Sequence, residues 1–522
     1  MKRVLVMLAA LPLMATIAPA SSRAQDDAAR HAQALIAGLD YDEARQVLAD
    51  ADGDAPAVAI ERARLALYEL DCDGAAAILA RPEVQKNERG EQLADIARGC
   101  QRVTAALVVD KDEARQVEIR WQDEHDRALA PLMFDTVAQA RDALTRDLGV
   151  DWPKPTRIVV VRDLLSLSAM TGLPYKSAQT TGTVAVAKWG RVTLLSPRAS
   201  HHGYSWRDTI AHELTHLAVT RASGDQAPLW LQEGVAKRQE IRWRPPGPFD
   251  DRPSPDAVVQ RGLELNLGLP LDKLGPSIAM LPSADAAMVA FAEVTSFVRF
   301  YAQSSGDDAL PKLFKELHVG KDADTALTEA SGADLKAWDT RWRAYIASRP
   351  REPLPALFGL GGEHADGDKL RDLRDRTRLA QLLLARGHAP EAVEELDRIA
   401  LTSSPVSAEA WERATGDPSV RWLRGRALEA VGRREEAQVL FDDPKQIVST
   451  FGPWWAIRGR WARLRGDEST ATASFFEAIA ADPLDVEGAC ESIDPAASPV
   501  DPAKKALCDA ARAAGEPELE ED

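Results

Sequence analysis

Two histidines and a glutamate lie together in the segment His212-Glu213-Leu214-Thr215-His216. Residues four apart in a helix lie one turn apart on the same face, so His212 and His216 can direct two imidazole nitrogens at one point. Neutral imidazole nitrogens bind zinc at about 2.0–2.1 Å. Glu213 lies about 100° around the helix from His212, so its carboxylate can face a metal-bound water without binding the metal. The pattern H-E-x-x-H is therefore typical of a zinc site with a general base.

The motif lies in a segment with readable helix ends. Ser205 is placed as the N-cap, and Asp208 three residues later forms a capping box in which Asp replaces the usual Glu. Gly224 is placed as the end of the helix, because glycine accepts the left-handed conformation that ends many helices. We therefore expect a single helix to carry both histidines.

A catalytic zinc ion needs a third protein ligand and an open position. Glu233 follows His216 by 17 positions and lies on a second helix, which Pro228 can start at its first turn. The small residues Gly234 and Ala236 are expected to let this second helix pack closely against the first. Glu233 is therefore the candidate third ligand.

The composition excludes several classes of protein. The 522 residues contain 64 Lys and Arg against 81 Asp and Glu, which gives a formal net charge of −17. An acidic chain without a Lys/Arg-rich block is a poor binder of nucleic acid or anionic membranes. Hydrophobic residues make up 45% and charged residues 28%, as in soluble globular proteins. The length suggests about three or four domains.

The first residues have the pattern of a signal peptide. Met1-Lys2-Arg3 is a positively charged start, and residues 4–17 are a mostly apolar run that is short for a membrane anchor. Small residues favour cleavage after Ala20 or Ala24. We expect residues 1–24 to be removed and the mature chain, without a membrane span, to be exported, either periplasmic or secreted. An uncleaved membrane anchor is the alternative.

Export permits disulfide bonds. The four cysteines form two pairs that are close in sequence, Cys72 with Cys100 and Cys490 with Cys508. We expect one bond near each end of the chain. Four buried thiols are the alternative.

Three segments near the C-terminus share a spacing of glycine, alanine and aromatic residues. Gly432 and Gly466 are 34 residues apart, and Gly387 precedes Gly432 by 45, which is 34 plus an insertion around residues 406–418. Each glycine is expected to turn the chain between two antiparallel helices, with small residues where the helices touch. The pattern resembles tetratricopeptide repeats.

The N-terminal region carries a fainter version of this pattern. Two helical hairpins are expected, one with Ala32, Leu35, Ala44 and Leu48 and one with Ala63, Leu67, Ala75 and Leu79. Two such units are marginal alone, because repeats bury a core by stacking. A plain helical bundle is the alternative.

The middle of the chain mixes strands and helices. Apolar and β-branched segments predict strands at 117–121, 157–161, 182–187 and 191–195, the last two as a hairpin. Periodic segments predict helices at 131–148, 286–303, 310–317 and 334–347. The expected fold is a central α+β domain flanked by all-α helical repeats. The expected domains are a signal peptide at 1–24, a helical repeat-like domain at 25–110, the central domain at 111–350, a linker at 351–369, and tetratricopeptide-like repeats with a capping helix and an acidic tail at 370–522.

Residues from about 115 to 350 resemble a gluzincin metallopeptidase of the peptidase-MA-like kind. The resemblance is carried by the H-E-x-x-H motif, the string Trp230-Leu231-Gln232-Glu233-Gly234-Val235-Ala236 and the closing stretch Trp338-Asp339-Thr340-Arg341-Trp342. It implies a zincin-like fold and one zinc ion bound by His212, His216 and Glu233. It also implies that Glu213 is the general base and proton shuttle, and that the strand near 182–187 binds a substrate backbone as an added strand.

One position departs from the family's pattern. Members often supply a Tyr to the developing oxyanion from a stretch like A-Y-A-x-S, and here the stretch reads Ala290-Phe291-Ala292-Glu293-Val294. Phe cannot donate a hydrogen bond. Tyr301 and Tyr204 are candidate substitutes, although each can instead be a packing residue. The G-x-M-E-N signature that holds a free amino terminus is absent, so nothing argues for exopeptidase action.

Two further polar sites have an ordinary interpretation. His201 and His202 are interpreted as residues of a polar loop, although they lie close to the metal helix in sequence. Glu240, seven residues beyond Glu233, is interpreted as a surface residue, with support of a metal ligand as the alternative.

Three functions remain open. The first is an exported zinc peptidase that hydrolyses peptide bonds and whose helical repeats recruit a protein substrate or partner. The second is a catalytically weak or inactive metallopeptidase fold that acts as a repeat-based binding or assembly protein in the cell envelope. In the third the metal only stabilises the central domain.

Overall fold

The computed structural model describes residues 19–150, 154–199, 204–246, 250–251, 253–274, 277–352, 354, 360, 367–401, 418–442, 451–494 and 499–515. The chain divides into two compact units, Met1–Gln101 and Arg102–Asp522. Residues 1–18, most of the expected signal peptide, lie outside the described residues. Among the residues that are described, no helix is both long and apolar enough to span a membrane.

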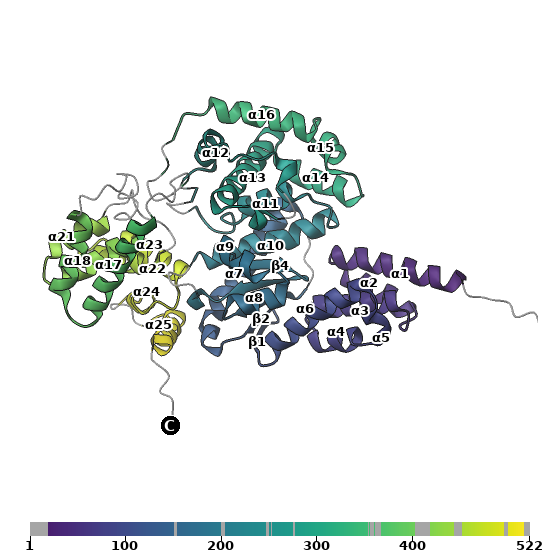
Figure 1. The fold of residues 1–522 in the computed structure, drawn as a ribbon, viewed down its shortest axis with the longest axis horizontal. Helices are drawn as coiled ribbons and strands as arrows, with labels where there is room; N and C mark the ends of the chain where they lie inside the picture. The colour runs from purple at the N-terminus through teal and green to yellow at the C-terminus, as the bar shows by residue number, and fades with distance from the viewer. Residues whose placement is uncertain are drawn as a thin grey trace, which may run out of the picture. The chain divides into compact units, whose positions relative to one another are not determined.

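The first unit is all-helical. Its helices are α1 (Pro19–Ala37), α2 (Tyr41–Asp50), α3 (Pro56–Tyr68), α4 (Cys72–Leu79), α5 (Pro82–Gln85) and α6 (Glu88–Thr104) (Figure 1). Helix α1 packs on α2 and α3 packs on α4, so both expected helical hairpins are present. The predicted disulfide Cys72–Cys100 is confirmed and joins α4 to α6.

The second unit contains a five-stranded mixed sheet. Its strands are β1 (Val108–Asp112), β2 (Val117–Trp121), β3 (Thr156–Val161), β4 (Ala185–Lys188) and β5 (Arg191–Leu195). They lie in the order β1-β2-β3-β5-β4, with the two outer pairs antiparallel and the two inner pairs parallel. Strand β4 is therefore an edge strand, and one side of its backbone is not paired within the sheet.

The strand predictions hold except at the sheet's two edges. Strands β2, β3 and β5 match the predicted segments, and the predicted hairpin of β4 and β5 is confirmed. Strand β4 begins at Ala185 and not at Gly182, because Gly182 is the left-handed C-cap that ends helix α9 (Tyr175–Thr181). Strand β1 was not predicted, since it has two acids and a lysine in five residues. It spans the expected domain boundary at 110/111, so the sheet begins before the predicted central domain does.

Helices cover the sheet and extend beyond it. They are α7 (Ala130–Leu148), α8 (Leu164–Thr171), α9 (Tyr175–Thr181), α10 (Trp206–Ser223), α11 (Leu229–Gln239), α12 (Pro255–Glu264), α13 (Ala284–Ser305), α14 (Ala309–His318), α15 (Ala323–Ser331) and α16 (Leu335–Ser348), with short 3-10 turns η1 (Glu124–Leu129), η2 (Pro197–Ala199), η3 (Leu271–Lys273) and η4 (Ile278–Met280). The four predicted helices of this region correspond to α7, α13, α14 and α16. The resulting architecture is an α+β domain flanked by helices.

Helix α10, which carries the H-E-x-x-H motif, is buried on nearly every side. It packs against α7, α11, α14 and strands β4 and β5. A helix in this position shows no clear apolar stripe, because most of its circumference packs against other elements. Its ends are as predicted: Ser205 is the N-cap, and Gly224 ends it with φ of 60°.

The expected capping box at this helix is wrong in detail. The side chain of Ser205 makes no capping hydrogen bond. The carboxylate of Asp208 instead accepts a hydrogen bond from Trp243 Nε1 at 2.9 Å and pairs with Arg244 at 2.8 Å. Asp208 therefore fastens the start of the metal helix to the segment after α11.

Gly234 allows a close helix contact, but with a different helix from the one predicted. A Cβ on Gly234 would lie 2.4 Å from Val298 Cγ2 and 2.6 Å from the backbone oxygen of Val294. Both atoms belong to α13. The small residue therefore serves the packing of α11 on α13, and the expectation that it faces α10 is corrected.

The C-terminal region consists of helical hairpins. Its helices are α17 (Gly367–Ala385), α18 (Ala389–Leu401), α20 (Pro418–Ala430), α21 (Arg434–Asp442), α22 (Gly452–Leu464), α23 (Glu468–Ala481), α24 (Val486–Glu491) and α25 (Pro502–Gly515). The predicted turn glycines Gly387, Gly432 and Gly466 have φ of 82°, 82° and 79° and lie between paired helices. The insertion expected around 406–418 lies almost entirely outside the described residues.

Glycines inside the hairpins explain the repeated spacing. A Cβ on Gly425 would lie 2.2 Å from the ring of Phe441, and one on Gly459 would lie 2.9 Å from the ring of Phe475. Each glycine therefore makes room for an aromatic ring of the paired helix. The predicted disulfide Cys490–Cys508 is confirmed and joins α24 to α25.

Candidate metal centre

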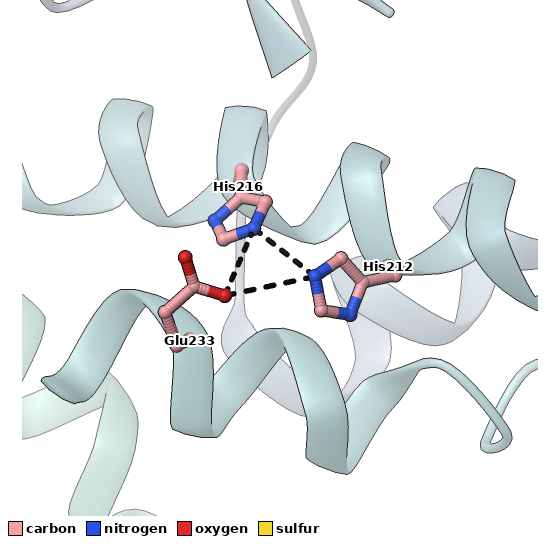
Figure 2. A group of neighbouring side chains, drawn as sticks. All are labelled: His212, His216 and Glu233. Carbon is pink, nitrogen blue, oxygen red and sulfur yellow. Dashed lines mark hydrogen bonds and ion pairs between the residues drawn. The ribbon is translucent and has the colours of Figure 1, made fainter. Parts of the chain in front are cut away.

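Three side chains from two helices converge on one point. His212 and His216 extend from α10, and Glu233 extends towards them from α11 (Figure 2). The two Nε2 atoms are 3.2 Å apart. Glu233 Oε2 lies 3.8 Å from His212 Nε2 and 3.7 Å from His216 Nε2. The structure thus brings together the three residues that the sequence proposed as ligands.

The spacing of these atoms fits a metal ion. Three ligands at about 2.0–2.2 Å from a tetrahedral centre lie about 3.3–3.6 Å from one another. The observed separations of 3.2, 3.7 and 3.8 Å are close to that geometry. Two imidazole nitrogens that face each other also need a cation or proton between them, because their lone pairs repel. The donor set of two imidazoles and one carboxylate is one that zinc prefers.

Glu240 fixes the orientation of His212. Its Oε2 lies 3.1 Å from His212 Nδ1, and its Oε1 lies 2.6 Å from Lys237 Nζ. A carboxylate only accepts, so Nδ1 carries the proton and Nε2 keeps its lone pair for a metal. Burial by itself would raise the pKa of Glu240, but the charge of Lys237 and the hydrogen bond from His212 lower the pKa to about 2. Glu240 therefore stays ionised.

The charge around His212 acts in the same direction. Burial by itself would lower the pKa of His212. The hydrogen bond to Glu240 and the negative charges of Glu213, Glu240 and Glu233 outweigh burial and raise the pKa. The site is therefore strongly anionic and favours a cation.

Gln232 has the same role beside His216. Its Oε1 lies 3.3 Å from His216 Nδ1. Glu240 and Gln232 both come from the segment that also carries Glu233. One segment thus supplies a metal ligand and the partner of each histidine, as is usual for residues that orient metal-bound imidazoles.

Glu213 is held by the edge strand and not by the ligand cluster. Its Oε2 accepts a hydrogen bond of 2.6 Å from the backbone N–H of Ala187 in β4. The side chain is largely buried, with 7% of the residue exposed. This contact fixes one carboxylate oxygen of Glu213 on the edge strand, while the side chain lines the same cleft as the three clustered residues.

The cluster opens into a cleft of about 590 Å³. Its walls are formed by α10, α11, the segment from Thr181 to Ala187, and residues Ala287 and Phe291 of α13. Phe291 therefore does face the cleft, as the resemblance implies for this position, and it brings a ring without a donor. Thr183 and Ser277 also line the cleft and carry hydroxyl groups.

Neither tyrosine that was considered as an oxyanion donor reaches this cleft. Tyr301 is fully buried on α13, with its hydroxyl 3.5 Å from the carbonyl oxygen of Ala309 and its ring against Trp338. The hydroxyl of Tyr204 donates to the backbone oxygen of Leu195. Both are packing residues, so the assignment of a catalytic role to Tyr301 is corrected. His201 and His202 lie outside the described residues.

Two residues of the site were underestimated or missed from the sequence. The sequence predicts Glu240 as a surface residue and indicates no role for Gln232. Seven residues are about two helical turns, and Glu240 caps the end of α11 in a helical conformation, so its spacing from Glu233 places both on the same side of the helix. That spacing is the signal in the sequence that could identify Glu240, and in the structure Glu240 contacts His212 Nδ1.

The closing stretch of the domain supports the same helices. Trp342 of α16 is fully buried and donates a hydrogen bond of 2.9 Å from Nε1 to Ser296 of α13. Its ring packs edge-on against Phe297, which packs in the same way against Trp230 of α11. A chain of aromatic contacts therefore runs from the end of the domain to the helix that carries Glu233.

The comparison with protein families agrees with the site. Residues 136–348 match the family model described as the Peptidase MA superfamily. No curated protein matches the chain. The matched residues cover less than half of the chain, but they include α10, α11 and every residue of the metal-ligand cluster. The stretch from 136 to 348 is thus similar to the Peptidase MA superfamily, which supports a gluzincin-like peptidase domain.

Proposed function

We propose that the chain is a zinc-dependent peptidase. The observation that carries the proposal is the convergence of two histidine nitrogens and the Glu233 carboxylate beside a separately held Glu213, at the wall of an open cleft. His212, His216 and Glu233 would hold the zinc ion, which would supply a water molecule of lowered pKa and a charge that polarises a carbonyl group. The donor set and its spacing support zinc as the metal.

Glu213 is the proton carrier in this mechanism. The N–H of Ala187 occupies Oε2 of its carboxylate, and Oε1 is the oxygen that takes a proton from water. Glu213 then delivers this proton to the amine that leaves when the peptide bond breaks. The fixed hydrogen bond holds the carboxylate in one orientation through both transfers.

The edge strand supports a peptide as substrate. Successive residues of a strand present their backbone groups to opposite sides, and Val184 accepts from β5 through its carbonyl oxygen. Ala185 and Ala187 therefore present their N–H and C=O groups away from β5. Both line the cleft. An extended peptide can pair as an added strand with the N–H and C=O groups of Ala185 and with the C=O group of Ala187, whose N–H already donates to Glu213.

The remaining parts of the proposal concern location and partners. The apolar start of the sequence and the two disulfide bonds support export to the periplasm or the medium. The helical hairpins from α17 to α25 support a role in recruiting a protein substrate or partner, because stacked helix pairs present extended surfaces.

Peptide hydrolysis by the purified full chain tests this proposal. We expect zinc-loaded protein to cleave members of a fluorogenic peptide library, chelation to abolish cleavage, and added zinc to restore it. The Glu213→Gln variant should bind zinc as the wild type does and lose about 10²–10⁴-fold in turnover, the usual contribution of general acid–base catalysis. Equal turnover by this variant would exclude the mechanism.

A second function is favoured by Phe291. With a ring and no donor at this wall of the cleft, the oxyanion has one fewer donor than in typical family members. The protein would then be a weak or inactive peptidase that binds partners through its helical hairpins. Zinc binding without cleavage of any library peptide, together with capture of the same peptides, would favour this function over the first.

A further inference from the structure

The cleft contains a single cationic side chain among the described residues that line it. That residue is Lys237, which lies one helical turn after Glu233 on the same face of α11. The other ionisable side chains of the lining are the two histidines and three glutamates of the site: His212, His216, Glu213, Glu233 and Glu240. Within the described lining, a substrate that enters this cleft therefore meets an ammonium group at Lys237 alone.

One hydrogen bond fixes the position of the Lys237 ammonium group and leaves its other N–H donors for a ligand. Its Nζ donates to Glu240 Oε1 at 2.6 Å, and about one third of its side chain is exposed. An ammonium group has three N–H donors. The bond to Glu240 takes one of them, so the group can donate to an incoming acceptor while it keeps its place.

The balance of charge favours an anionic acceptor at this position. Glu213, Glu233 and Glu240 bring three negative charges to the cleft, and Lys237 brings one positive charge. A bound divalent cation balances the other two charges. The loaded cleft is then close to neutral overall, and Lys237 and Glu240 form an ion pair within it. A substrate carboxylate that reaches Lys237 is therefore not repelled by the site as a whole, and it shares the ammonium group with Glu240.

We infer that Lys237 determines specificity by binding a carboxylate of the substrate close to the scissile bond. This inference rests on the proposed peptidase function and deepens it. The carboxylate is either an acidic side chain or the free C-terminus of the peptide, and both offer the same acceptor. A charge-assisted hydrogen bond of this kind is among the stronger ones in proteins.

Matched peptides separate the two sources of the carboxylate. One set compares Glu or Asp with Gln or Asn at each position around the cleavage site. The other compares free with amidated C-termini. Each set is measured for hydrolysis by the zinc-loaded full chain, and by calorimetry for binding to the Glu213→Gln variant and to the metal-free protein.

We expect the wild type to prefer the carboxylate-bearing member of one set by about 10–100-fold, the range of a hydrogen bond to a charged group. Lys237→Met should remove this preference in both hydrolysis and binding, and Lys237→Arg should keep most of it. Lys312→Met is the matched control, because Lys312 is an exposed lysine of α14 that does not line the cleft. It should leave the preference unchanged.

Two results would overturn the inference. One is a wild type that binds both members of every pair alike. The other is a Lys237→Met variant that weakens all peptides equally or loses zinc affinity, because Lys237 would then only position Glu240. If the wild type cleaves nothing but binds carboxylate peptides through Lys237, the inference stands and the peptidase proposal fails.

Discussion

The helix pair α10–α11 and the hairpin α22–α23 differ in the kind of residue that they bury between their helices. Along α22–α23 the buried positions are mainly apolar, and the ring of Phe475 lies against Gly459. Along α10–α11 and the C-cap residue Glu240, the buried and partly buried positions include two histidines and three carboxylates, and all three carboxylates act on His212 through their charge. Burying charge costs free energy unless it is paired or binds a metal. The pair α22–α23 therefore stabilises the protein. The pair α10–α11 keeps charged groups partly buried at a cost in free energy, which a bound cation would offset.

The largest change, in zinc affinity, should come from removing one of the proposed metal ligands. Glu233→Ala should weaken zinc binding by more than the about 10–100-fold that residues behind metal ligands contribute. The metal-free variant should melt no lower than the metal-free wild type, since a buried carboxylate is removed. Competition with a chromophoric chelator measures the affinity, and calorimetry measures the melting. A variant that binds zinc normally would show that this cluster is not the metal site.

A smaller effect should come from Glu240, which contacts a ligand and no metal. Glu240→Gln leaves a partner for His212 Nδ1 but removes a negative charge and the ion pair with Lys237. We expect zinc affinity to fall by about 10–100-fold. Glu264→Gln is the control, because Glu264 is a carboxylate on α12 that pairs with Arg261 outside the cleft. An unchanged zinc affinity in Glu240→Gln would show that the carboxylate of Glu240 is not required to orient His212.

A substitution in the hairpin α22–α23 should lower the free energy of unfolding and leave zinc affinity unchanged. Gly459→Leu places a side chain where even a Cβ would lie 2.9 Å from Phe475, so we expect a loss of about 1–3 kcal/mol in unfolding free energy. Ala473→Leu, at an exposed position of α23, should cost far less. Urea unfolding and zinc titration separate the two properties. Loss of zinc affinity in Gly459→Leu would show that the two helix pairs are coupled.

A last effect should appear as a dependence of folding stability on pH. Glu293 of α13 is fully buried, and burial raises its pKa to about 7 although the Leu269 N–H lowers it in part. Between about pH 4.5 and 7 the folded protein holds a proton that the unfolded chain has released, so this residue's contribution to stability falls as pH rises. Glu293→Gln should be free of that fall. Measuring the unfolding free energy of the wild type and the variant at pH 5 and pH 8 tests this. The same change between the two pH values in both proteins would contradict it.

Much of the local structure was predictable because it depends on neighbours in sequence. The i, i+4 spacing of His212 and His216 fixes them on one helix face, and Gly224 ends that helix. The turn glycines of the C-terminal hairpins and the two disulfide pairs follow from short-range spacing in the same way. Strand β1 was missed because its polar residues lack the apolar pattern of the other strands.

The sequence by itself determined which residues could bind a metal, which could carry a proton, and on which helices they lie. Only the tertiary structure decided what stands around them: Ala187 on Glu213, Glu240 on His212, and Lys237 in the wall of the cleft. It also decided that Tyr301 packs in the core while Phe291 faces the cleft. The reason is physical. Spacing along one helix fixes which side chains share a face, whereas contacts between elements depend on how separate helices and strands pack, and no local pattern records that packing.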